Sequence, residues 1–255
     1  MILIAKGSAP KGFATRAAAA GANLERQYQA DRAAYDAGRK SLKPNSAVYG
    51  SKAIKDNLKA SHAHKCAYCE EHLPAKIAHG HVEHYRPVAY SQQAKGGAKF
   101  NPGYYWLAYD WGNFLLSCHF CNSRKKRNLF PLHNPAARVR AKGSIAGELP
   151  ALIKPDIEDP APHIDWRKDV PVGVSPKGID TINLLGLDQP AHEERLKRYL
   201  EAEAFHEMVS QLHASPDPNG LALGAKVRAK LNSWALPGQP FSAMIAAYLR
   251  DNPLP

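Results

Sequence analysis

The sequence contains no run of apolar residues close to the ~20 residues that a transmembrane helix requires. Its first residues, Met-Ile-Leu-Ile-Ala, are interrupted by Lys6 and are too few for the apolar core of a secretory signal peptide. No internal repeat, low-complexity tract or Walker A spacing occurs, so the chain has no phosphate-binding loop of that type. We therefore expect a soluble, cytoplasmic protein without membrane association.

Cysteine is scarce as well. The 255 residues include four cysteines, arranged as two Cys-x-x-Cys pairs, Cys66 with Cys69 and Cys118 with Cys121. Two thiolates at this spacing reach one ion from a tight turn, and two such turns complete the tetrahedral site of a structural Zn2+ ion. The alternatives are two disulfides, which a reducing cytosol disfavours, or four unliganded thiols. Four nearby histidines could each replace one cysteine, although four cysteines suffice: His62, His64, His72 and His79.

Acidic residues are scarce in the first half of the chain, and the whole chain carries a net charge of +11. Residues 1–60 contain 11 Lys and Arg against 4 Asp and Glu, residues 61–135 contain 9 against 4, and residues 136–255 contain 14 against 15. A basic surface favours a polyanionic partner, because neutralised phosphates release their counterions. A charge that only maintains solubility is the alternative.

The same boundaries divide the predicted organisation into a basic helical region (1–60), a central region (61–135) and a loop followed by helices (136–255). Apolar spacing and chain-breaking residues predict the elements of each part. The predicted helices lie at 13–42, through Ile54 and Leu58, from Cys118 toward Pro131, and at about 190–213, 222–233 and 241–250, with short strands within 82–90 and 113–117 and a loop at 136–178. The prediction is an α+β protein that is mainly helical.

Four segments of the central region follow one another in a specific order. They are Cys66-x-x-Cys69, Glu83-His84-Tyr-Arg-Pro87, Trp111-Gly-Asn113-Phe-Leu-Leu and Cys118-x-x-Cys121-Asn122-x-x-Lys125. In these residues the chain resembles the HNH endonuclease family. Further segments resemble its PtuB (Septu) and retron-associated branch: Cys69-Glu70, Phe130-Pro131-Leu132, and 178–187 followed by Arg195.

The resemblance implies a ββα-metal core, in which a β-hairpin and a helix surround one divalent ion and four-cysteine zinc knuckles clamp the base of the hairpin. N- and C-terminal helices would flank this core. It also implies a nuclease effector of antiphage defence that acts beside an ABC-type ATPase partner. The near-neutral residues 136–255 are the predicted docking surface for that partner.

Phosphodiester hydrolysis requires a base that deprotonates water and a metal ion that neutralises charge on the phosphate. His84, with an ordinary pKa of ~6.5, is the predicted base. Glu83 and Asn122 are the predicted ligands of a catalytic Mg2+ or Mn2+ ion. The family often has His where this chain has Asn122 and commonly Asp where it has Glu83, and the amide oxygen of Asn122 favours these hard ions. The resemblance assigns Asn113 the role of bracing the loop that carries the base.

The basic side chains near these residues are predicted to contact nucleic acid, preferably DNA: Arg86, Arg124, Lys125, Lys126 and Arg127. Arginine offers a bidentate fork to a phosphate, and lysine offers a point charge. A solvated helix face is the alternative for the run from Arg124 to Arg127.

Two other functions fit the same residues. A zinc-ribbon module could bind nucleic acid without cutting it, and then Glu83, His84 and Asn122 need not converge. A ribonuclease with a folded RNA target would use the same site, because both nucleic acids present similar phosphates.

Overall fold

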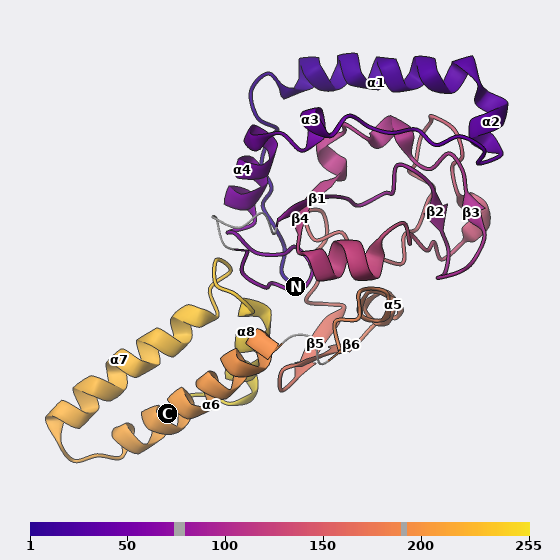
Figure 1. Cartoon of the computed structure of the whole chain (residues 1–255). Helices are drawn as coiled ribbons and strands as arrows, with labels where there is room; N and C mark the ends of the chain where they lie inside the picture. Colours follow the sequence, from indigo (N-terminus) through magenta and orange to yellow (C-terminus); the bar gives the residue numbers. More distant parts are fainter. Residues whose placement is uncertain (74–79, 190–192) are drawn as a thin grey trace.

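The structure is a computed structural model that describes residues 1–73, 80–189 and 193–255 (Figure 1). The helices are α1 (Phe13–Ala30), α2 (Arg32–Asp36), α3 (Ser46–Tyr49), α4 (Lys52–Ser61), α5 (Pro176–Leu185), α6 (Glu193–His213), α7 (Pro218–Trp234) and α8 (Ser242–Asp251). The strands pair antiparallel as β1 (His81–His84) with β4 (Phe114–Ser117), β2 (Ser91–Gln92) with β3 (Lys99–Phe100), and β5 (Ile164–Arg167) with β6 (Val170–Gly173). Short 3-10 helices η1 (Tyr105–Leu107), η2 (Trp111–Asn113) and η4 (Pro135–Ala137) and the π-helix η3 (Phe120–Lys126) lie between them. The predicted mixture of helix and strand is confirmed.

The N-terminal segment forms two helices where one was predicted for 13–42. Asp31 separates α1 from α2, because its backbone φ of −151° leaves the helical region. The shorter helix predicted next is confirmed as α4. Its Ile54 and Leu58 lie four residues apart on one face and are completely buried in the core.

The central sheet and the helix after it are both shorter than predicted. β1 ends at His84, and the chain then turns into a loop at Pro87, which has no N–H to donate to a strand partner. His84 pairs in register with Phe114 at the start of β4. The helix after β4 ends at Lys126, because the next residue, Arg127, has a left-handed φ of +50°, and so it does not reach Pro131. An antiparallel strand pair is thus followed directly by a short helix.

The segment predicted to be an irregular loop at 136–178 contains the β5–β6 hairpin and the start of α5. The Ser175 hydroxyl accepts the N–H of Gly178 at 3.1 Å and caps α5, and Pro176 occupies its first turn. The prediction missed this helix. Gly186 ends it in the left-handed conformation with a φ of +58°.

The C-terminal helices form a lobe in which α6 and α7 lie side by side and project from the rest of the molecule (Figure 1). The predicted helices of this region are confirmed, although residues 190–192 of the first one lie outside the described residues. Buried side chains of residues 1–187 form one hydrophobic core, and those of 199–245 form a second. The three-part division at 60 and 135 stays a prediction. None of the described helices is long and apolar enough to cross a bilayer.

A buried polar cluster joins the C-terminal lobe to the first cysteine pair. The Lys65 ammonium donates to the Glu70 carboxylate at 3.0 Å and to the carbonyl oxygens of Pro237 and Gln239 at 2.7 and 2.8 Å. The Ser242 hydroxyl, at the start of α8, donates to the same carboxylate at 2.8 Å. Lys65 and Glu70 flank the Cys66–Cys69 turn, so the C-terminal lobe is attached to the rest of the protein at this turn.

Lys65→Met should lower the free energy of unfolding by about 3 kcal/mol, because the buried Glu70 carboxylate then keeps only the Met1 amino group as a cationic partner and two buried carbonyl oxygens lose their donor. Urea unfolding measures the loss, and hydrogen exchange should show faster opening of 237–242. The control is Lys197→Met, which breaks an exposed pair with Glu194 and should leave the unfolding curve unchanged. Equal losses in the two variants would contradict the anchoring role.

Candidate functional site

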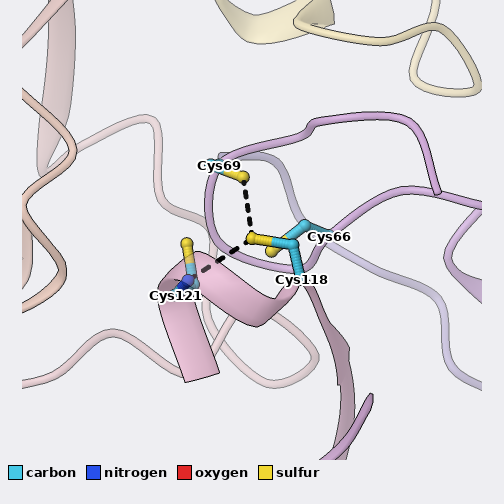
Figure 2. Close-up of side chains that lie close together, drawn as sticks. All are labelled: Cys66, Cys69, Cys118 and Cys121. Atoms are coloured by element: carbon cyan, nitrogen blue, oxygen red, sulfur yellow. Dashed lines mark hydrogen bonds between the residues drawn. The ribbon is translucent and has the colours of Figure 1, made fainter. Parts of the chain in front are cut away.

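The four cysteine side chains converge in the interior, where the turn after α4 meets the start of η3 (Figure 2). Their Sγ atoms lie within 4.8 Å of one another, and those of Cys69 and Cys118 are 3.8 Å apart. A zinc ion with four Zn–S bonds of about 2.3 Å would place the sulfurs of a regular tetrahedron about 3.8 Å apart. A disulfide requires about 2.05 Å, so the geometry fits one zinc ion and not two disulfides.

Among the described residues, no histidine joins this cluster. His62 is buried in the core, where its Nε2 accepts the N–H of Leu116 in β4 at 3.2 Å. The rings of His64 and His72 lie against each other with centroids 6.4 Å apart. His79 lies outside the described residues.

A cleft of about 620 Å³ lies beside β1. Glu83 and His84 line it from β1, Asn122 and Arg127 line it from η3 and its end, and Tyr49 lines it from α3. Three of the residues predicted to take part in catalysis therefore share one cleft. A zinc ribbon that only binds nucleic acid would not require these three residues to share a cleft.

His84 is half-buried between two aromatic rings, with centroids 4.8 Å away for Tyr49 and 5.3 Å away for Phe114. Its Nε2 lies 3.0 Å from the carbonyl oxygen of Ala108. Because a carbonyl only accepts, Nε2 carries the proton and Nδ1 keeps the lone pair. Burial lowers the pKa of His84 to about 4, and the charge of Lys126 acts in the same direction. The ring is therefore neutral at pH ~7, as a general base must be.

Asn113 is buried, and its side chain forms hydrogen bonds with the backbone of the loop that follows β1. Its Oδ1 accepts the N–H of Arg86 at 2.8 Å, and its Nδ2 donates to the carbonyl oxygens of Arg86 and Leu107 at 3.0 and 3.2 Å. Both ends of the amide are engaged with backbone. The contacts suit the predicted bracing role, which stays a prediction.

Glu83 lies at the inner wall of the cleft and is only 3% exposed. Its Oε1 is 2.5 Å from the Nζ of Lys126, which is itself fully buried. Burial raises the pKa of Glu83, and the charge of Lys126 opposes this rise. Lys126 also donates to the carbonyl oxygen of His84 at 3.0 Å. One ammonium therefore contacts both residues of the Glu83-His84 pair.

The donors at the cleft fit a hard divalent ion. Asn122, half-buried at the start of η3, offers an amide oxygen, and Glu83 offers a carboxylate, which are the donor types that Mg2+ and Mn2+ prefer. Such an ion would complete its shell with waters and substrate oxygens, because two protein ligands leave most positions open. Glu83 and Asn122 stay the predicted ligands.

Two of the five basic side chains that were predicted to contact phosphate are buried. Arg86 is buried, paired with the Glu148 carboxylate, and its guanidinium lies over the Tyr104 ring at 5.1 Å. Lys126 is buried against Glu83. Both charges are already paired with a carboxylate inside the protein, which disfavours a phosphate contact.

The other three basic side chains lie at the surface. Arg124 and Arg127 are exposed, and Lys125 is half-buried, where it donates to the side chain of Gln189. Phosphate contact stays a prediction for these three residues.

Sequence analysis missed two residues that shape the site. Tyr49 contacts the ring of His84, although 35 residues of sequence separate them and α3 has only four residues. Glu148 neutralises Arg86 from the loop at 136–178. The Asn45 cap before α3 signals a helix start, but no local pattern connects either residue to the Glu83-His84 pair.

Comparison with known proteins places the chain near two relatives. It is 37% identical over 121 residues to Septu protein PtuB of Bacillus mycoides (strain KBAB4), which covers 47% of this chain and 40% of that protein. It is 26% identical over 222 residues to Septu protein PtuB of Bacillus thuringiensis, which covers 83% of this chain and 74% of that protein. The first alignment thus spans less than half of that relative's length. No family model matches the chain, and no solved structure matches it.

The cysteine cluster predicts one zinc ion for each chain, measurable by elemental analysis of the purified protein. Cys118→Ser should lose the zinc and the cooperative thermal transition, because binding of a structural zinc ion contributes folding free energy. His119→Ala changes an exposed residue in the same turn and should keep both properties. Full zinc content in Cys118→Ser would contradict the four-thiolate site.

His84 should make the stability of the protein depend on pH. The folded ring stays neutral down to about pH 4, whereas the unfolded ring takes up a proton near its ordinary pKa, so acidification through this window favours the unfolded state. Between pH 7 and pH 5 this effect amounts to about 2 kcal/mol. Urea unfolding of the wild type and of His84→Gln at both pH values measures it. The variant should lose less stability on acidification, and parallel losses would refute the shifted pKa.

Proposed function

We propose that the chain is a metal-dependent endonuclease of the HNH type that hydrolyses phosphodiester bonds of nucleic acid, preferably DNA. The observation that carries the proposal is that His84, Glu83 and Asn122 line one cleft. The β1–β4 pair followed by η3, with the four thiols beside it, supports the proposed ββα-metal core. The relatives named Septu protein PtuB support a role as the nuclease effector of an antiphage defence system.

In this proposal His84 is the general base. Its Nε2 proton is held by the Ala108 carbonyl, so Nδ1 accepts the proton of the attacking water. Tyr49 and Phe114 keep the ring in place from two sides. Asn113 fixes the backbone that follows the base through its bonds to Arg86.

Glu83 and Asn122 would hold a Mg2+ or Mn2+ ion, which, when bound, supplies positive charge against the scissile phosphate. Arg124, Lys125 and Arg127 are the proposed contacts to neighbouring phosphates. The exposed position of the two arginines suits a backbone that passes over the end of η3.

The proposed partner is an ABC-type ATPase, with the C-terminal lobe as its docking surface. This part of the chain carries no excess of positive charge, so it is poorly suited to a second nucleic-acid contact. Its helix α6 exposes Leu196, Leu200 and Met208, with exposed fractions of 44, 52 and 42%. A folded RNA target is the alternative substrate, since the same cleft residues would serve both nucleic acids.

Incubation with nucleic acid tests the function directly. Wild-type protein, alone and together with an ABC-type ATPase as the proposed partner, is incubated with plasmid DNA and with total RNA in the presence of Mg2+. We expect cleavage of DNA, with loss of at least about 100-fold in rate for His84→Ala, because general-base catalysis contributes 10²–10⁴-fold.

The matched control is His119→Ala, which removes an exposed histidine outside the cleft and should keep full activity. Cleavage of RNA alone would favour the ribonuclease alternative. Nucleic-acid binding without cleavage in any combination would favour the zinc-ribbon alternative and refute the enzyme.

A further inference from the structure

Lys126 is a basic residue without access to solvent that contacts Glu83 and His84 of the candidate site from inside the protein. Its side chain has no exposed surface, although it belongs to the basic run that continues from Arg124 to Arg127. Removing an ammonium from water is costly unless charged and polar partners replace the water. Its partners are the Oε1 of Glu83 at 2.5 Å and the carbonyl oxygen of His84 at 3.0 Å.

These contacts come from the two segments that form the cleft. Lys126 lies near the end of η3, four residues after Asn122, whereas Glu83 and His84 end β1. β1 pairs with β4 and not with η3, so the hydrogen bonds that define the sheet do not fix η3 against Glu83. The Lys126 side chain supplies this connection at the site itself.

We propose that Lys126 is a positioning residue of the nuclease site. It holds the Glu83 carboxylate and the end of β1 in place relative to Asn122. The inference rests on the proposed function and assigns a task to a residue that its burial excludes from phosphate binding. Lys126 pairs with Oε1 of Glu83, and the other carboxylate oxygen would be the one that ligates an ion in the cleft that Glu83 lines. Partners that orient a ligating carboxylate in this way commonly change metal affinity 10–100-fold when removed.

The test compares Lys126→Met, which keeps the length and removes the charge, with Arg127→Gln, which changes an exposed neighbour in the same run. Mn2+ binding to the zinc-loaded protein is measured by electron paramagnetic resonance of the free ion. Binding to a labelled DNA duplex is measured without Mg2+ or Mn2+ over a range of salt concentrations. Zinc content and circular dichroism report whether each variant is folded.

Lys126→Met should weaken Mn2+ binding at least about tenfold and leave DNA affinity and its salt dependence unchanged. Arg127→Gln should do the reverse, with a salt slope smaller by about 1 and unchanged Mn2+ affinity. Lys126→Arg, which keeps a cation, should recover part of the lost Mn2+ affinity. If Lys126→Met does not fold, Lys126→Gln retains a donor for the His84 carbonyl and is measured in its place.

Four results would overturn the inference. Weaker DNA binding in Lys126→Met would make Lys126 a phosphate contact, and tighter Mn2+ binding would make it a competitor of the ion. Mn2+ binding that is unchanged in a folded variant, or absent in the wild type, would show that the pair of Lys126 and Glu83 does not orient a metal ligand. Wild-type protein that binds Mn2+ but cuts no nucleic acid would refute the proposed function and not the positioning role.

Discussion

The candidate site depends on the attachment of two chain segments that the sequence keeps far apart. Cys69 and Cys118 are 49 positions apart, yet their sulfurs are 3.8 Å from each other in the interior. Within the described part of the chain, the sheet at this point is a pair of four-residue strands, and two strands of this length are marginally stable without further support. A zinc ion held by four thiolates would supply that support. It would fix the turn after α4 to the start of η3, and with them the walls of the cleft.

Buried ion pairs extend this attachment outward from the cysteines. Glu70 follows Cys69 and holds Lys65 beside the C-terminal lobe, and Glu83 in β1 holds Lys126 at the end of η3. A third pair joins Arg86 to Glu148. In all three pairs the charges are inside the protein, where losing one partner costs far more than at the surface. Several of the basic residues therefore stabilise the scaffold, and the positive charge available to a nucleic acid is smaller than the sequence total suggests.

The fold was predictable where local chemistry determines it. Apolar spacing identified α4 from Ile54 and Leu58, and the paired cysteines identified a cluster whose geometry fits zinc. Prediction failed where long-range contacts decide. Nothing near Lys126 in the sequence distinguishes it from the exposed Arg127, because the difference is made by Glu83, 43 positions earlier. The same holds for Tyr49, which acquires its place beside His84 only through the packing of α3.

The charges around Glu83 also bear on the order in which the proposed nuclease would assemble its site. A single carboxylate already faces the Lys126 ammonium, so a divalent ion placed at the same carboxylate would leave positive charge in excess. In the low dielectric of a buried site this excess reduces, without reversing, the gain in ion affinity that Lys126 provides by orienting the carboxylate. A substrate phosphate offsets it, and the ion in turn strengthens the hold on the phosphate, because coupling between two ligands is reciprocal. The neutral ring of His84 adds no further positive charge, since its pKa lies near 4.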